Sequence, residues 1–169
     1  MTINLKDIPD AVKSYLDNKV TVTISGVTPR NGDAVNPNES FTFRVAVANA
    51  NAANGGVALN NVLYHLSVDH PAVIKFKVPP TANGSAKDLQ GNVLAAGALV
   101  GEMIFNPSSA AFDLPAGDND SLTVSGIAGS NASGGNATIH ARVLAHIDMN
   151  LLFPKGGTST AARPIEVIG

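Results

Sequence analysis

Four residues late in the sequence carry oxygen atoms that suit a hard cation. They are Asp113, Asp118, Asn119 and Asp120, and Gly117 lies among them. Carboxylate and amide oxygens are the ligands that Ca²⁺ takes in proteins. The spacing of these residues differs from that of a defined calcium loop, and Asp and Asn also favour turns because they bond to their own backbone. We therefore expect no obligatory cofactor, with calcium at these four residues as the alternative.

A histidine, a serine and a carboxylate alternate along one expected strand, as His65, Ser67 and Asp69. Residues two apart on a strand lie about 6.5–7 Å apart, whereas a catalytic relay needs hydrogen bonds of about 3 Å. The sequence contains no Gly-x-Ser-x-Gly elbow, no Walker loop and no paired-carboxylate motif. These observations favour a solvated strand face and predict that the chain is not an enzyme and has no catalytic residue.

A second set of potential metal ligands alternates along a later expected strand, as His140, His146 and Asp148. Imidazole and carboxylate groups bind zinc, but a third ligand would have to come from His65 or His70. Arg142 lies on the same side of this strand, and its charge opposes the binding of a cation. A polar surface with no metal is therefore the favoured interpretation.

Two groups of apolar residues are candidate partner contacts. Leu151, Leu152 and Phe153 follow the longest expected strand and precede a Lys-Gly-Gly loop. Burying each is worth about 1.5–3 kcal/mol, so they either plug the end of their own core or enter a partner. The second group, Leu5, Ile8, Val12 and Tyr15, forms a helical stripe in residues 5–18. This helix either packs over its own sandwich or docks on a neighbouring subunit.

Composition argues against several classes of ligand. There is no cysteine, which excludes disulfides, thiolate zinc sites and a cysteine nucleophile. The formal net charge is −2 and no stretch is clearly basic, so nucleic acid is not expected. Tryptophan is absent, and both tyrosines, Tyr15 and Tyr64, fall on faces expected to be buried, so no aromatic platform is available for sugars. We expect a protein partner or self-assembly rather than a small-molecule ligand.

Alternation of apolar and polar side chains predicts a mainly β fold. Phe41, Phe43, Val45 and Val47 fall on one side of a strand. In the next strand Val62, Tyr64, Leu66 and Val68 are expected to point inward, and Leu63, His65 and Ser67 outward. We expect strands at residues 20–26, 40–49, 60–69, 74–78, 99–105, 121–126, 136–149 and 165–168. Pro79 and Pro80 end the fourth, which predicts an edge strand. Residues 81–98 form either a strand pair or a short helix.

These elements predict an immunoglobulin-like antiparallel β-sandwich of about seven to nine strands, preceded by a short N-terminal helix. Residues 1–18 would form the helical extension and residues 19–169 the sandwich. The first residues lack a basic segment followed by an apolar one, so we expect no secretory signal and synthesis in the cytoplasm. The longest apolar-rich run, residues 93–100, is too short to span a bilayer, so membrane insertion is not expected.

The order of these features resembles a known family. An opening Val-Thr-Val-Thr-Ile-Ser-Gly, a turn-rich loop, the strand over residues 40–49, and the later Phe-Asp-Leu-Pro-Ala-Gly-Asp-Asn-Asp-Ser-Leu-Thr-Val are similar to bacterial immunoglobulin-like domains of the CARDB (cell-adhesion-related) type. The resemblance covers roughly residues 20–150. It implies a non-catalytic spacer, adhesion or assembly module.

Two functional expectations follow from this resemblance. Immunoglobulin-like sandwiches also recur on phage and phage-tail-like particles, so the first is a structural subunit or decoration protein that acts by protein–protein contacts, at a particle surface. The alternative is a calcium-assisted adhesin or carbohydrate-binding module on the cell surface.

Overall fold

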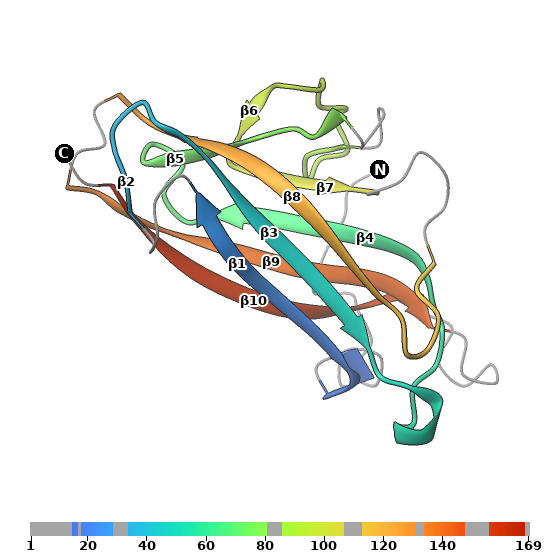
Figure 1. Cartoon of the computed structure of the whole chain (residues 1–169). Coiled ribbons are helices and arrows are strands. Elements are labelled where there is room, and N and C mark those ends of the chain that lie inside the picture. Colours follow the sequence, from blue (N-terminus) through green and yellow to red (C-terminus); the bar gives the residue numbers. More distant parts are fainter. Residues whose placement is uncertain are drawn as a thin grey trace.

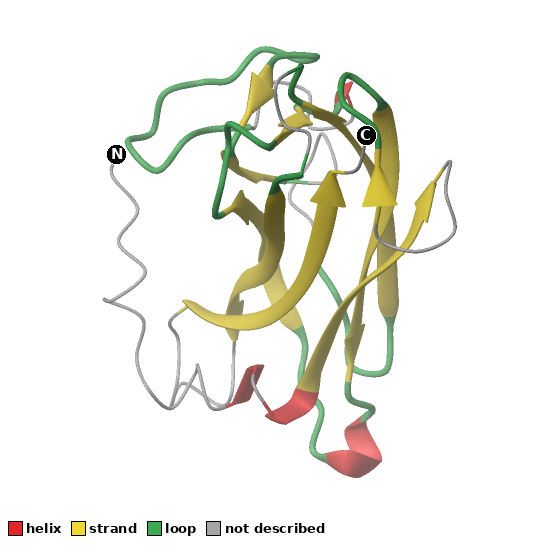
Figure 2. Cartoon of the chain, turned by 90° about the vertical axis from the view of Figure 1, so that its left-hand side faces the viewer, coloured by secondary structure: helices red, strands yellow, loops and turns green. Residues whose placement is uncertain are grey.

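The computed structural model describes residues 15–16, 18–28, 34–80, 86–106, 113–130, 134–147 and 156–167. Ten strands in these residues form two five-stranded sheets that face each other (Figures 1 and 2). The predicted β-sandwich is confirmed. The described part of the chain contains no helix of seven or more residues, so the predicted N-terminal helix is not supported. Residues 1–14 lie outside the described residues, and the domain boundary after residue 18 stays a prediction.

The two sheets differ in the order of their strands. Sheet A consists, in spatial order, of β1 (Val20–Thr28), β3 (Ser40–Asn49), β8 (Asn119–Ala128), β5 (Ile74–Lys77) and β6 (Leu99–Val100). Sheet B consists of β2 (Ala34–Val35), β10 (Gly156–Val167), β9 (Asn136–Ile147), β4 (Leu59–Val68) and β7 (Glu102–Phe105). The described strand pairs are antiparallel except for β2 and β10, which run parallel. One short 3₁₀ turn, η2 (Ala52–Asn54), follows β3.

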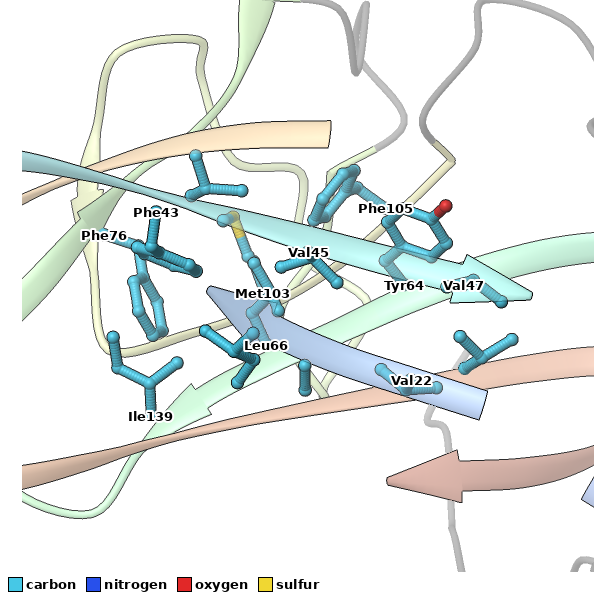
Figure 3. Packing of buried hydrophobic residues seen from close by; sticks show 14 of the residues in the cluster. Val22, Phe43, Val45, Val47, Tyr64, Leu66, Phe76, Met103, Phe105 and Ile139 are labelled. Atoms are coloured by element: carbon cyan, nitrogen blue, oxygen red, sulfur yellow. The ribbon is translucent and has the colours of Figure 1, made fainter. Parts of the chain in front are cut away.

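The core lies between the sheets and follows the predicted alternation. The inward residues predicted for β3 and β4 are all buried. Figure 3 shows Phe43 and Phe76 packed together at one end of the core and Tyr64 beside Phe105 at the other. The ring centres of each pair lie 5.8 Å apart, and the second pair meets edge to face. Such ring pairs add to the stabilisation from the burial of apolar area, which holds the two sheets together.

One predicted strand, over residues 99–105, is divided between the two sheets. Its first part, β6, pairs with β5 in sheet A, and its second part, β7, pairs with β4 in sheet B. The chain changes sheets at Gly101, where a Cβ atom would lie only 2.9 Å from Cβ of Pro71. Glycine therefore allows the backbone to turn this corner against the proline ring.

The structure corrects two further predictions in this region. β5 is not an edge strand, because β8 lies on one side of it and β6 on the other. Residues 86–98 form neither a helix nor a regular strand pair. Lys87 instead exchanges two backbone hydrogen bonds with Ile104 of β7, and the Asp88 carboxylate accepts bonds from the backbone of Gln90 and Asn92 in a tight turn.

In sheet B, β2 is absent from the expected set, and β10 is much longer than the strand predicted over residues 165–168. β10 begins at Gly156, in a segment expected to be a loop, and pairs with β9 over eleven residue pairs. Its sequence is rich in Gly, Thr, Ser and Ala and contains Pro164, so it carries a weak apolar alternation. β2 has only two residues and pairs with Glu166 and Val167 of β10. Backbone pairing to β9 and β10, which the sequence pattern does not reveal, defines these strands.

We find no helical segment in the described part of the chain with the length and apolarity needed to cross a bilayer.

Candidate functional site

The predicted calcium ligands lie in the loop before β8 and in the first two residues of that strand, at an end of the sandwich, but two of them hold the fold together. Asp113 Oδ1 accepts a hydrogen bond from the backbone N–H of Asn61 at 3.0 Å. Asp120 Oδ2 accepts the phenolic proton of Tyr64 at 2.5 Å, which joins sheet A to sheet B. Burial, together with this bond, raises the pKa of Tyr64, so the phenol stays protonated and donates.

The other two predicted ligands, Asp118 and Asn119, are exposed. In the described residues no group of three or more His, Cys, Asp or Glu side chains is placed to hold a metal ion. The structure therefore places the four residues in the loop and the start of β8, and it assigns Asp113 and Asp120 to protein partners. Calcium binding stays a prediction. We call residues 113–120 the acidic loop.

A buried asparagine positions this acidic loop, and the sequence patterns did not reveal it. Asn49, at the end of β3, donates from Nδ2 to the carbonyl oxygens of Val57, Leu114 and Pro115 at 2.7, 3.2 and 3.2 Å. Its backbone N–H donates to the carbonyl oxygen of Asp118 at 2.9 Å. Satisfying these carbonyl groups fixes the loop to the end of the core. The only signal in the sequence is a polar residue at an inward position of an apolar strand.

The histidine predicted to face solvent is buried, which corrects the expected outward position of His65. Its side chain is 3% exposed, and Nε2 lies 2.8 Å from Oε2 of Glu102 on β7. Nδ1 is buried and has no hydrogen-bond partner. Its strand lies inside sheet B, and in the register His65 lies between Ile104 of β7 and Arg142 of β9, two residues with large side chains. Alternation within one strand does not reveal which residues of neighbouring strands lie beside it.

The other residues considered above as catalytic groups or zinc ligands have separate roles. Asp69 Oδ1 accepts the backbone N–H of Thr138 at 2.7 Å, so it ties β4 to β9. His140 is half-buried and pairs with Ser67 across the strands. His70 is exposed, with Nε2 3.8 Å from a carboxylate oxygen of Asp69. The side chain of His146 and the whole of Asp148 lie outside what the structure describes.

Most of the predicted partner contacts cannot be placed. Leu151, Leu152, Phe153, Leu5, Ile8 and Val12 lie outside the described residues. Tyr15 is described and is buried in the core of its own chain, so it faces its own sandwich rather than a partner. Its hydroxyl accepts the backbone N–H of Val57 at 2.7 Å and lies 3.2 Å from Oδ1 of Asn49.

The outer faces of the two sheets differ in exposure. Outward side chains of sheet B between residues 63 and 67 on β4, on β7, and between 138 and 144 on β9 are buried or half-buried. Sheet A is more open, and hydroxyl groups dominate its outer face. They include those of Thr21, Thr23, Ser25, Thr28, Ser40, Thr42, Ser121, Thr123 and Ser125. The charged side chains that point outward from its described strands, Arg44, Lys75 and Lys77, are all cationic.

Two hollows on sheet A meet at Leu99 and Ile127, which line both. The larger, about 420 Å³, also contains Lys77 and the hydroxyl groups of Thr42 and Ser125. The smaller, about 220 Å³, contains Lys75. Neither hollow is lined by a carboxylate. We call the joined hollows the lysine groove. The alternation of Ile, Lys, Phe and Lys in β5 agrees with the outward position of both lysines. The hollows themselves form only because β5 pairs with β6 and β8, which brings Leu99 and Ile127 beside the lysines.

No protein-family model matches the sequence, and no curated protein matches it. Solved structures of similar fold include AvmM, which catalyzes macrocyclization in alchivemycin A biosynthesis, with 12% identity, 90% of each chain covered and a TM-score of 0.54. The major pilin subunit BcpA of Bacillus cereus has 12% identity and a TM-score of 0.50, over 89% of this chain and 40% of the pilin.

A CARDB domain from Pyrococcus furiosus aligns with 15% identity and a TM-score of 0.41, over 88% of this chain and 87% of that domain. The predicted resemblance to CARDB domains is one of fold. At these identities the likeness of all three structures is one of fold alone.

Proposed function

We propose that this chain is a non-enzymatic β-sandwich module that acts through protein–protein contacts, as a repeating subunit or decoration protein of a larger particle such as a phage or phage-tail-like particle. The observation that carries the proposal is the open outer face of sheet A, with its hydroxyl groups, its few charges and the exposed Leu99. The outer face of sheet B is more covered and offers less accessible surface at its centre.

The chemistry of this face suits a protein contact. Interface cores are depleted in charged residues, because removing a charge from water costs free energy unless it is paired. Along β3 and β8 the outward positions are mostly Ser, Thr and Ala, with Arg44 as the charged exception. The Arg44 guanidinium is already bonded at 2.8 Å to the Ser121 hydroxyl. A partner can cover such a surface while its hydroxyl groups exchange water for protein acceptors.

The histidine partners support a structural rather than a catalytic role. The His65 imidazole is bonded to Glu102, and the Asp69 carboxylate is bonded to the backbone of β9. Both contacts join neighbouring strands of sheet B, so the groups that suggested a hydrolytic relay contribute to strand pairing.

The proposal is tested by sedimentation of the full chain from micromolar to millimolar concentration, with chemical cross-linking to locate the contact. We expect the mass to rise with concentration and the cross-links to map to sheet A. Thr123→Arg, which puts a long cation in the centre of this face, should weaken association and leave the thermal midpoint unchanged. Gln90→Arg, in an exposed turn outside sheet A, is the matched control. A chain that stays monomeric and cross-links to no partner from its native source would contradict the proposal.

A further inference from the structure

We infer that the acidic loop of one copy of this chain docks in the lysine groove of the next copy, so that copies associate head to tail. The inference rests on the proposed function and names its contact. The occupant of the groove is a second copy, because loop and groove are complementary in charge and in the placement of apolar groups.

The groove presents two cations beside an apolar patch. Lys75 and Lys77 are exposed and lie two apart on β5, which separates their Cα atoms by about 6.5–7 Å. Neither lysine makes an ion pair with another described residue. Leu99 is 47% exposed and lines both hollows with Ile127. The site therefore suits a segment that carries carboxylates around a small apolar tip.

The acidic loop has this composition. Asp113 and Asp118 are exposed, and Pro115 is exposed between them. The Asp118 carboxylate has no hydrogen-bond partner in the described structure. The loop is also held in place: Leu114 exchanges backbone bonds of 2.8 and 2.9 Å with Leu59, and the Gly117 N–H donates to the Ala50 carbonyl at 2.9 Å. A loop fixed in advance loses little conformational freedom on binding.

The positions of loop and groove require two copies. The acidic loop ends on Asn119 and Asp120, the first two residues of β8, whereas Lys75 pairs with Ile127 near the other end of that strand (Figure 1). Ten residues of strand span about 30 Å at roughly 3.3 Å per residue, so the loop cannot reach the groove of its own chain. Different patches then meet in each contact, which is a heterologous association. Such contacts close into rings or continue as filaments.

The expected association is weak and sensitive to salt. Exposed ion pairs contribute little free energy because water and salt screen them, and the contact of Pro115 with Leu99 and Ile127 must supply the rest. Raising the ionic strength to about 1 M shortens the screening length to about 3 Å. The self-association should therefore be tested at high protein and low salt.

Two charge variants of the full chain test the contact by sedimentation and light scattering. Lys75→Glu/Lys77→Glu reverses the charge of the groove. Asp113→Asn/Asp118→Lys replaces the two exposed negative charges of the loop with one positive charge. The Asp113→Asn change keeps a side-chain oxygen that can accept the Asn61 N–H. We expect each variant alone to associate at least roughly tenfold more weakly than wild type, which is about 1.4 kcal/mol. Mixed, they should form a dimer with one copy of each, because the intact loop of the first fits the intact groove of the second.

Lys87→Glu/Gln90→Glu adds negative charge in an exposed segment outside sheet A and outside the groove, and it should associate as wild type does. Circular dichroism and thermal melting check that all variants fold. Wild-type association that both variants retain, or folded variants that fail to pair when mixed, would overturn the head-to-tail contact and leave the proposed function standing. A wild-type protein that does not associate with itself would also overturn the head-to-tail contact. In that case the proposed function would be judged separately, by whether sheet A cross-links to a partner from the native source.

Discussion

At the scale of single residues, His65 combines burial with an incomplete set of hydrogen bonds. Burial lowers the pKa of its imidazole, the hydrogen bond and charge of Glu102 act in the opposite direction, and the charge of Arg142 lowers it further. The net pKa is below the ordinary value of 6.5. The neutral ring then donates from Nε2 to Glu102 and leaves Nδ1 as a buried acceptor without a donor. Protonation of Nδ1 would place a charge in this buried position.

This predicts that the protein loses stability in mild acid. Because the pKa of His65 is lower in the folded chain than the value of about 6.5 in the unfolded chain, the unfolded chain binds more protons between the two pKa values. The contribution of His65 is therefore fully present above about pH 6.5 and declines as the pH falls toward the folded pKa. Urea unfolding between pH 5 and 8, read as the free energy of unfolding, measures it.

His65→Gln keeps a donor toward Glu102 but does not titrate, so its unfolding free energy should depend less on pH over this range. His70→Gln removes a histidine whose side chain is 64% exposed, and it should keep the wild-type dependence. Equal pH dependence in wild type and His65→Gln would contradict the assignment.

At the scale of elements, β8 joins β3 to β5 through close backbone approach. Gly126 pairs with Phe41 of β3 and with Phe76 of β5. A Cβ atom at Gly126 would lie 2.6 Å from Cζ of Phe41 and 3.0 Å from the carbonyl oxygen of Lys75. The Phe41 ring thus occupies the space that a side chain on β8 would fill. Glycine lets three strands of sheet A pack here without displacing a core ring.

We predict that Gly126→Ala destabilises the sandwich by about 1–3 kcal/mol, the usual cost of an overpacked core. Phe41→Leu alone should also destabilise the protein, because it removes part of a buried ring. In the double variant the leucine relieves the clash, so the loss should be smaller than the sum of the two single losses. A double-mutant cycle from urea unfolding measures this coupling. Strictly additive losses would show that Phe41 does not set the requirement for glycine.

At the scale of the whole molecule, one side of the sandwich is closed by contact between an outer strand of each sheet. β1 is an edge of sheet A, and β10 has only the two-residue β2 on its outer side. Arg163 of β10 reaches across and donates from Nη1 to the carbonyl oxygen of Ile24 in β1 at 2.8 Å. The register of β1 with β3 also shifts between Ser25 and Thr28. A bulge and a side-chain donor both make an edge less available for pairing with another chain.

We predict that Arg163→Met, which keeps an apolar stem and removes the donors, lowers the free energy of unfolding by about 1–2 kcal/mol. Amide hydrogen exchange in β1 should become faster, with smaller changes in β4 and β7. Arg44→Met, on the open face, is the matched control. Unchanged exchange in β1 would show that the Arg163 contact does not hold the two edges together.

The sequence determined the sandwich and most of its inward side chains. Alternation in residues 40–49 and 60–69 predicted the buried faces of β3 and β4 correctly, because burial of one face of a strand produces a local, period-two pattern. The alternation of Ile, Lys, Phe and Lys in β5 agrees with the exposure of Lys75 and Lys77, and the acidic residues from 113 to 120 stand out as one cluster in the sequence. These features depend on residues close together in the chain.

Only the tertiary structure decided which strands pair, and therefore what each polar side chain does. The strand over residues 99–105 divides between two sheets at Gly101, β10 forms from a sequence with weak alternation, and His65 is covered by its neighbours. Asp120 accepts the Tyr64 hydroxyl proton across the core, and Leu99 and Ile127 line the same groove. The physical reason is that these contacts join residues far apart in the chain. Register and sheet packing set such contacts, whereas a periodic pattern reports only which side of its own strand a residue occupies.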